Sequence, residues 1–484
     1  MFRKVHPMRS LLRFVLTALL AAQCVQAQSQ AGQSQPDAGA QAAATASDLG
    51  YIPANGTSQD TEASAKTSDP NTPWLPITIN GESPTVALAG ELTRSNELRG
   101  GLTVTSGYDD NALAENGKPA GNASFSFMPS LSVEQSRIHT LFDLSYNPGF
   151  SANQASQLNT NTQAVNLNLQ YRFTQYLTLR VHDVFSSSNN PYADATAGTD
   201  SVPGSVLHQP SEAVLTPFAN RISNLGGVDL IYQLGPGAIL GGSGTSDLLN
   251  YDNLAGGPGV QLIDSRSEGA DLFYKHRVWY NQWIGVTYSY QRFTFSGGAE
   301  QTDTNTALLF YTIPVHSHLT LSVFGGAAYS VTNGQATIIP TVAIPASSQQ
   351  WLPNEGMTLS WQGKHTGIST TFSRSIAGGG GLFGTVDRYN GTVDIRQQFR
   401  PRWTGTLDLL YDNNRPIDFI TSDEFRTLSA AVGLQHQIGE HLYFGFSYSR
   451  VHQVYGGLTA AQLFPDHNRT FLSISYLFNR PLGR

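Results

Sequence analysis

The chain has 484 residues, a formal net charge of −7 at pH 7 and only 13% charged residues, whereas roughly a quarter of the residues in an average soluble domain are charged. Its 28 lysines and arginines are scattered singly, and a surface that binds nucleic acid needs them clustered, so we expect no nucleic-acid partner. No stretch after the N-terminus offers the run of about eighteen apolar residues that a membrane-spanning helix needs. If this chain spans a membrane, it must do so as a closed β-barrel, since only helices and closed barrels satisfy all backbone hydrogen bonds in lipid.

Residues 1–27 have the features of an export signal peptide. Basic residues precede and enter an apolar run over 11–22, and Val25-Gln26-Ala27 provides a cleavage site. Cys24 leaves a lipoprotein as the alternative, although Gln23 stands where the lipoprotein peptidase needs a small residue. Cleavage after Ala27 removes the only cysteine, so the mature chain would have no disulfide and no thiolate.

Residues 28–98 form the second predicted region. As far as residue 66 the chain is mainly Gln, Ala, Ser, Thr and Gly, and such a segment cannot bury enough apolar surface to offset its ordering entropy. We therefore predict a disordered tether. The apolar residues around Trp74 predict a short strand or plug segment near its end.

From residue 99 to 478 apolar and polar residues alternate with a period of two, the pattern of a strand whose two faces meet different surroundings. The clearest example is Val165 to Phe173, where every odd position is apolar and every even position polar. Segments of this kind lie near 99–109, 121–133, 138–147, 163–173, 176–185, 219–234, 238–249, 267–278, 283–295, 304–313, 318–331, 355–362, 366–374, 385–399, 403–412, 424–438, 442–450 and 468–478. The fold class predicted is all-β, a transmembrane antiparallel β-barrel of about 18 strands, with 16 and 20 as alternatives.

The connections between these segments separate a membrane barrel from a β-sandwich, in which strands alternate in the same way. Short connections at 174–175, 235–237, 400–402 and 439–441 alternate with long ones at 186–218, 250–266, 332–354 and 451–468. Transmembrane barrels have short periplasmic turns and longer external loops. Aromatic residues beside the short turns predict a periplasmic girdle: Phe173, Tyr176, Trp279, Tyr280, Trp283, Phe399 and Trp403.

Two segments resemble known outer-membrane proteins. Leu472 to Phe478 resembles the C-terminal signal by which the barrel assembly machinery recognises its substrates, with residues 479–484 as an added tail. The segment Gly107-Tyr108-Asp109-Asp110-Asn111-Ala112 is similar to the opening of outer-membrane porins found beside exopolysaccharide-export genes. Its alternative interpretation is a strand end followed by a loop, which Asp and Asn favour. The resemblance implies a location in the bacterial outer membrane, contact with its lipid, and a homo-oligomer as an option.

The sequence shows no assembled catalytic or metal-binding constellation. His316-Ser317-His318 lacks further ligands nearby, and Gly378 to Gly381 lacks the strand, helix and lysine of a phosphate loop, which favours an external loop. We therefore expect no enzyme, no metal and no cofactor.

The polar positions of the alternating strands are predicted to face the lumen. The candidate lining residues are Asn166, Asn168, Gln170, Arg172, Arg180, Asp229, Asp271, Lys275, Arg277, Ser289, Gln291, Asp394, Arg396 and Asp408. Barrels of this size leave an aqueous channel, so the first interpretation is a porin-like channel for hydrophilic solutes or polysaccharide, narrowed if the loop 186–218 folds inward. The alternatives are a structural or surface barrel with an occluded lumen, a barrel enzyme acting on lipid or peptide, and a soluble secreted β-protein.

Overall fold

The computed structural model describes residues 96–112, 121–137, 139–154, 159–188, 219–253, 263–279, 282–296, 300–316, 318–334, 338–339, 342–343, 347–379, 383–417, 424–455 and 466–482. The chain divides into Met1–Ala38 and Gly39–Arg484, and all of these residues belong to the second unit. The predicted signal peptide, the tether up to residue 95 with its Trp74 segment, and most of the loop 186–218 lie outside the described residues.

The described chain consists of β-strands joined by turns and loops. Eighteen strands form one sheet, and β12 and β13 form a separate two-stranded hairpin. The strands are β1 (Glu97–Asp109), β2 (Asn122–Ser136), β3 (Thr140–Asn153), β4 (Thr160–Arg172), β5 (Leu177–Ser188), β6 (Ala219–Gly235), β7 (Ala238–Asn253), β8 (Ser265–Trp279), β9 (Gln282–Phe295), β10 (Glu300–His316), β11 (Leu319–Gly334), β12 (Ile338–Ile339), β13 (Val342–Ala343), β14 (Ser347–Gln362), β15 (Thr366–Gly379), β16 (Phe383–Arg400), β17 (Trp403–Pro416), β18 (Phe425–Gln437), β19 (Leu442–Tyr455) and β20 (His467–Pro481).

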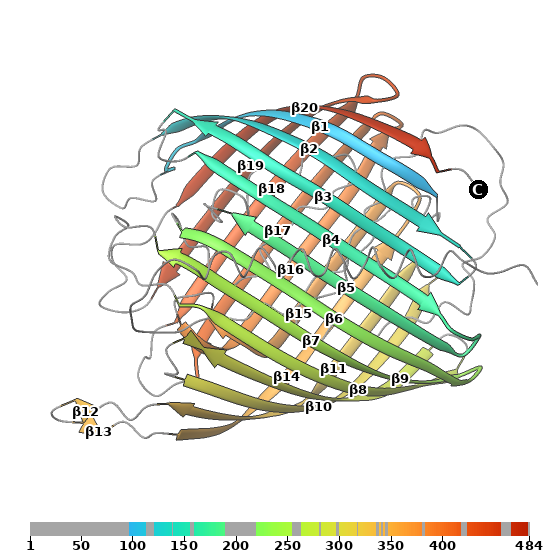
Figure 1. Cartoon of the computed structure of the whole chain (residues 1–484), viewed down its shortest axis with the longest axis vertical. Coiled ribbons are helices and arrows are strands. Elements are labelled where there is room, and N and C mark those ends of the chain that lie inside the picture. The colour runs from blue at the N-terminus through green and yellow to red at the C-terminus, as the bar shows by residue number, and fades with distance from the viewer. Residues whose placement is uncertain are drawn as a thin grey trace, which may run out of the picture. The chain divides into compact units, whose positions relative to one another are not determined.

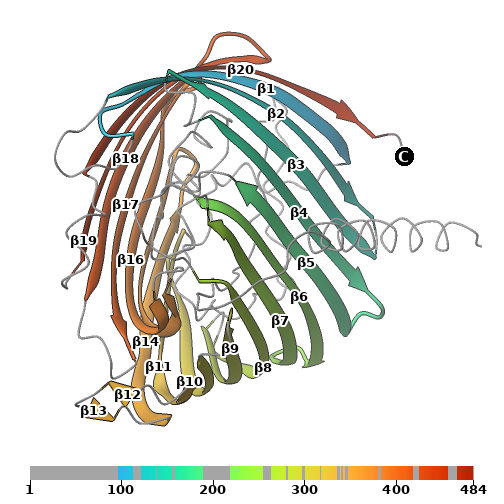
Figure 2. The same cartoon turned by 60° about the vertical axis from the view of Figure 1, so that its left-hand side comes forward.

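The eighteen-stranded sheet closes on itself (Figures 1 and 2). Strands that follow one another in the chain pair antiparallel, and β11 pairs with β14 across the small hairpin. The first strand pairs with the last along its whole length, from Glu97 opposite Pro481 to Asp109 opposite Arg469. This pairing confirms the predicted closed antiparallel barrel of 18 strands.

The predicted strands match the barrel strands in order, but some of their ends differ. β20 continues to Pro481, so the first part of the predicted tail 479–484 is strand. It continues because β1 begins at Glu97 rather than at residue 99, and Asn479 Nδ2 donates to Glu97 Oε2 at 2.6 Å. β14 begins at Ser347 instead of residue 355, because it keeps pairing with β11 through the stretch predicted as a loop.

The two faces of the wall have different compositions. On β6, Val228, Leu230 and Tyr232 are exposed large apolar side chains, whereas Asp229 and Ile231 between them point to the other face. A hydrogen bond between strands that are not neighbours identifies that other face as the interior. Thr302 of β10 shares the buried polar face, and it accepts a hydrogen bond from Thr385 of β16 at 2.8 Å, although three strands separate β10 from β16 along the wall.

The outer face has aromatic residues beside the short turns. Phe173, Trp279 and Phe399 are exposed there, as the sequence predicted, while Tyr280 lies outside the described residues. The prediction is wrong for Trp283, which packs inside the barrel with Phe273. The reason is strand alternation: Gln282 pairs with Trp279 across the turn, and the next residue along the strand faces the opposite side.

At the loop ends of the strands, tyrosines form a second aromatic group that the sequence analysis did not identify. Their hydroxyls donate to polar side chains of adjacent strands, as Tyr290 does to Asp303 Oδ1 at 2.6 Å and Tyr329 does to Gln349 Oε1 at 2.8 Å. Tyrosine suits a boundary between apolar and aqueous surroundings because its ring and its hydroxyl are then both satisfied. No helix in the described ranges is long and apolar enough to cross a membrane.

Candidate functional site

The strand register places all fourteen predicted lining residues on the inner face. Cross-strand partners share a face, and one row runs from Gln170 through Arg180, Asp229 and Ser243 to Asp271, opposite Ser289. On the other side of the barrel, Asp394 lies opposite Asp408, and both are buried. The predicted set therefore forms two groups, one on β4–β9 and one on β16–β17, which face each other across the interior (Figure 2).

The inner face of β15–β20 is strongly polar. Its centre is the carboxylate of Asp412, which is 0% exposed and accepts hydrogen bonds from Arg388 Nε at 2.8 Å, Asn390 Nδ2 at 3.1 Å and Asn414 Nδ2 at 2.8 Å. Arg388 also donates through Nη2. A buried ion pair with these extra hydrogen bonds offsets the cost of removing both charges from water. The sequence analysis missed Asp412, although it keeps the alternation that starts at Asp408.

The inner face of β6–β11 carries apolar clusters that the sequence analysis did not predict. Ile231, Ile239 and Phe273 form one cluster, against which Trp283 packs. Leu308, Phe310 and Phe324 form another. The signal was present in the sequence, since Ile231 interrupts the alternation of its strand with an apolar residue at an inward position. The interior is therefore polar on one side and partly apolar on the other.

The loop end of the β15–β16 hairpin leaves the barrel wall. β14 and β15 pair only along their turn-side halves, as far as Glu355 opposite Arg374. Beyond that point β14 stays paired with β11, and β15 stays paired with β16. Pro353 lies just past the separation on β14, and proline is tolerated at a strand edge because it has no N–H to pair.

The separated hairpin packs against the inner face of β9–β11. Ile376 of β15 is buried in a cluster with Phe293 and Phe295 of β9 and Ala328 of β11. On β16, Thr385 Oγ1 donates to Thr302 of β10. Ile376 has the same parity as the exposed Phe372, so the outer face of the hairpin rests on the inner face of the adjacent wall. The hairpin thus occupies part of the lumen at its loop end.

This arrangement corrects one expectation and leaves another untested. Gly378 and Gly379 were expected in an external loop, but they are buried residues of β15 beside a β-bulge. Glycine fits there because strand glycines are often found at bulges, and the register shifts between Gly378 and Gly379. The loop 186–218, predicted to narrow the lumen, is described only for Ser186–Ser188, which belong to β5.

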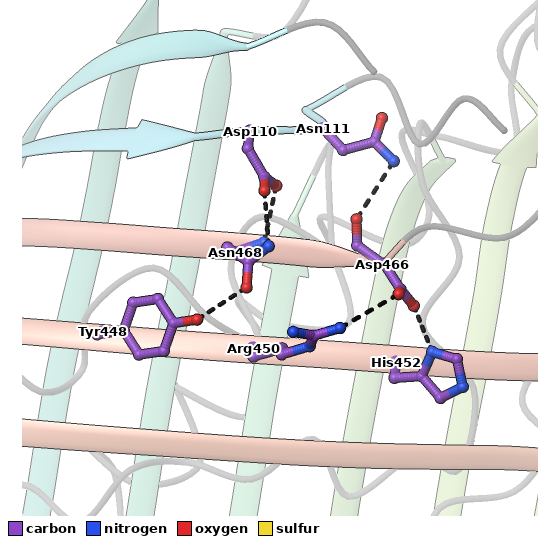
Figure 3. Close-up of polar contacts among 7 residues, drawn as sticks. All are labelled: Asp110, Asn111, Tyr448, Arg450, His452, Asp466 and Asn468. Carbon is purple, nitrogen blue, oxygen red and sulfur yellow. Dashed lines mark hydrogen bonds and ion pairs between the residues drawn. The ribbon is translucent and has the colours of Figure 1, made fainter. Parts of the chain in front are cut away.

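The segment Gly107 to Ala112 lies where the first and last strands meet. Asp110 accepts two hydrogen bonds from Asn468, from its backbone N at 2.8 Å and its Nδ2 at 2.6 Å, and Asn468 accepts one from the Tyr448 hydroxyl at 2.8 Å (Figure 3). On the preceding residue, Asp109 Oδ2 accepts from Arg469 Nε at 2.6 Å. These contacts continue the pairing of β1 with β20 beyond the end of the ladder. The segment therefore closes the barrel at its seam.

Asp466 extends this network on the outside of the seam (Figure 3). Its backbone oxygen accepts from Asn111 Nδ2 at 3.4 Å, and its carboxylate contacts Arg450 at 3.4 Å and His452. All three residues of the ion-paired group are about half exposed, so these pairs contribute little to stability.

A similar ion-paired group lies at the loop end of β17 and β18. The Glu424 carboxylate, just before β18, accepts hydrogen bonds from Arg426 and from Arg415 Nε at 2.5 Å. The guanidiniums of Arg426 and then Arg415 lower the pKa of Glu424. Charged groups at this level mark the end of the apolar outer surface.

Within the part of the chain that the structure describes, no three His, Cys, Asp or Glu side chains come together as metal ligands. The rings of His316 and His318 lie 6.0 Å apart at the turn between β10 and β11.

No protein-family model matches the chain, and no curated protein matches it. Its structure is similar to the outer membrane protein OpdK from Pseudomonas aeruginosa, with 12% identity, a TM-score of 0.38, and coverage of 80% of this chain and 100% of OpdK. It is similar to the ferric-catecholate import receptor Fiu from E. coli K12, with 9% identity, a TM-score of 0.42, and coverage of 80% and 82%. For the ferric citrate transporter FecA the identity is 12% and the TM-score 0.40; 80% of this chain is covered, and it spans only 66% of FecA, just under two thirds. None of the three is named for exopolysaccharide export, so that resemblance stays a prediction, and the fold rests on this chain's own strand pairing.

Proposed function

We propose that the protein is a porin-like channel of the bacterial outer membrane, through which small hydrophilic solutes pass. The observation that carries this proposal is the closed 18-stranded barrel with exposed apolar side chains outside and buried polar and charged side chains inside. A soluble β-protein buries its apolar face, whereas a transmembrane barrel turns it toward lipid and keeps the polar face for the lumen. Barrels with this number of strands are wide enough for an aqueous channel.

The inward hairpin favours small solutes over a polysaccharide chain. It takes up space at the loop end, where Ile376 and Thr385 reach β9 and β10. The same observation favours a second candidate, a structural barrel with an occluded lumen.

Single-channel recording separates these candidates. The mature protein from Gln28 is refolded and inserted into planar lipid bilayers, with and without residues 28–95. Discrete, stable conductance in the longer protein would support the open channel. Conductance only after truncation would identify an N-terminal plug, and none in either form would favour the occluded barrel.

Membrane insertion is proposed to depend on the last strand. On β20 the outward residues Leu472, Ile474, Tyr476 and Phe478 are all exposed and apolar or aromatic, the pattern that the barrel assembly machinery would recognise. Phe478→Ala should reduce the amount of folded protein in the outer-membrane fraction of cells. Thr470→Ala, an outward change on the same strand before this segment, is the matched control and should leave that amount unchanged. Equal amounts for both variants would contradict recognition through this segment.

A further inference from the structure

Two arginines share one carboxylate on the outer face of the barrel, at the loop end of β17 and β18. Arg415 and Arg426 both donate to Glu424. They point outward because they have the same parity as the exposed Tyr411 and Leu428 on their strands. Both guanidinium side chains are about half exposed. The group therefore has one positive charge more than its single carboxylate balances.

The adjoining strand has a similar group. Arg450 and His452 of β19 both contact the carboxylate of Asp466, which lies just before β20 (Figure 3). These two residues point outward with the exposed Val454, and both are about half exposed. Here too, one carboxylate serves two basic side chains.

The strand register joins the two groups. Arg426 lies opposite Asn413 on β17 and opposite Val454 on β19. Arg415 and His452 are each two positions away from those partners, so both are diagonal neighbours of Arg426 on the same face, about 7–8 Å from it. The outer face at this level therefore carries one continuous row of basic side chains, the rim band, which consists of Arg415, Arg426, Arg450 and His452.

The loop ends of β8 and β9 are different. Arg266 is paired with Glu268, and Arg292 with Asp303, so each of these outward guanidiniums has a carboxylate of its own. The excess of positive charge distinguishes β17–β19 from that side of the barrel. Half-exposed ion pairs contribute little to stability, so the rim band is not explained by a need to hold the barrel together.

The outer face of the same strands is apolar from the rim band toward the turn end. Leu428 and Val432 on β18 and Phe444 and Phe446 on β19 are all exposed. Leu428 is only two residues from Arg426, so the apolar surface begins next to the basic side chains. A ligand that matches both features has an anionic group beside a long apolar body, which is the chemistry of an anionic lipid.

We propose that the rim band binds the phosphate group of a lipid in the leaflet around the loop end of the barrel. The inference rests on the proposed position of the barrel in the outer membrane. A guanidinium donates two parallel hydrogen bonds to a phosphate, and the acyl chains of the lipid lie along Leu428 and Phe446. Glu424 holds Arg415 and Arg426 in place and competes with the phosphate for them.

The test is native mass spectrometry of the full mature protein in detergent, which counts the lipid molecules bound. The probe is dilauroyl phosphatidic acid, and dilauroylglycerol has the same chains without the phosphate. Phosphatidic acid should bind at least tenfold more tightly than dilauroylglycerol. R415Q/R426Q should weaken its binding at least tenfold. The matched control is R266Q/R292Q, which removes two outward guanidiniums at the same end of the barrel and should leave the affinity within twofold.

Two further variants separate lipid binding from a structural role of the ion pairs. E424Q removes the carboxylate that competes with the phosphate, so it should tighten the binding of phosphatidic acid at least threefold. R415K/R426K keeps both positive charges and should bind within about threefold of the wild type. Heat-modifiable migration in gels checks that each variant forms a barrel. Weaker binding by E424Q, or equal weakening in the two glutamine double variants, would overturn the proposal.

Two controls separate the lipid site from a free anion site and from the channel. Inorganic phosphate in tenfold excess should not displace phosphatidic acid, and displacement would reject a lipid as the ligand. Equal affinity for the two lipids would also reject it. Because the lipid assay needs no conductance, preferential binding of phosphatidic acid by a protein that does not conduct would retain the lipid site and reject the channel. Conductance without that preference would retain the channel and reject the lipid site.

Discussion

Replacing Ile376 with alanine should release the end of the β15–β16 hairpin from the inner wall. Ile376 is 5% exposed and is buried with Phe293, Phe295 and Ala328. The change removes three carbon atoms, each worth about 0.8 kcal/mol on transfer from water, and the cavity left behind brings the loss to about 2–5 kcal/mol. Because about 1.4 kcal/mol changes an equilibrium tenfold, even the lower limit reduces the docked population relative to the free one by roughly thirtyfold.

The assay is single-channel recording of the I376A variant in planar bilayers. A released hairpin should raise the mean conductance and the current noise, because the lumen widens and the hairpin moves between docked and free positions. Leu308→Ala is the matched control, since Leu308 is equally buried on the inner face but packs with Phe310 and Phe324 instead of the hairpin. It should lower stability without changing the current. Two results would refute the conclusion that the hairpin narrows the lumen. One is the same current in the wild type and both variants, and the other is an equal rise in current in both variants.

Three other substitutions test the ion pair, the seam and the membrane face. Asp412→Ala leaves the guanidinium of Arg388 buried without its carboxylate, so the free energy of unfolding in urea should fall by about 3–5 kcal/mol. Replacing both Asp412 and Arg388 with leucine should recover most of that free energy. A double variant that is as unstable as Asp412→Ala would contradict the role of the unpaired guanidinium. Asp110→Ala removes the acceptor of two hydrogen bonds from β20 and should cost about 1–3 kcal/mol, with faster hydrogen exchange along the β1–β20 ladder than in β8–β9; exchange that rises uniformly would argue against a local seam. Leu230→Arg should weaken folding into lipid vesicles by about 2–4 kcal/mol if that side chain lies near the bilayer midplane, whereas Gln291→Arg on the inner face should cost less than about 1 kcal/mol; equal costs would rule out the assigned orientation.

The strands could be predicted from the sequence because alternation is a local property. In Val165 to Phe173 the polarity of each residue indicates which face of the strand it occupies. The same pattern, repeated along the chain, predicts eighteen strands, and the structure pairs them in the order in which they follow one another. The inward positions follow by parity, which is why the register places the fourteen predicted lining residues on one face. Parity also has a limit. At Phe273 and Trp283 both faces of the strand are apolar. The sequence then does not indicate which of the apolar residues faces the lipid and which faces the lumen.

The inward course of the hairpin could not be predicted, because it depends on contacts between strands that are distant in sequence. Thr385 and Thr302 are 83 residues apart, and neither differs from its neighbours in a way that reveals the contact. The local hints are Pro353, where β14 loses its neighbour, and the glycines at 378 and 379. These residues indicate an irregularity, but each is equally consistent with an external loop.

Among the described residues, the hairpin contributes to the cluster around Phe293 and Phe295 but not to those around Phe273 and Phe310. Phe293 and Phe295 would be exposed to the lumen if the hairpin followed the wall, and Ile376 would face outward, so each side of this contact requires the other. Trp283 lies ten positions before Phe293 on β9, about 33 Å along the strand. The hairpin therefore meets this wall at the loop end, whereas Lys275 and Trp283 lie toward the turn end. Because the hairpin contact and the cluster of Phe273 and Trp283 are this far apart on the same strands, a substitution in one should leave the packing of the other intact.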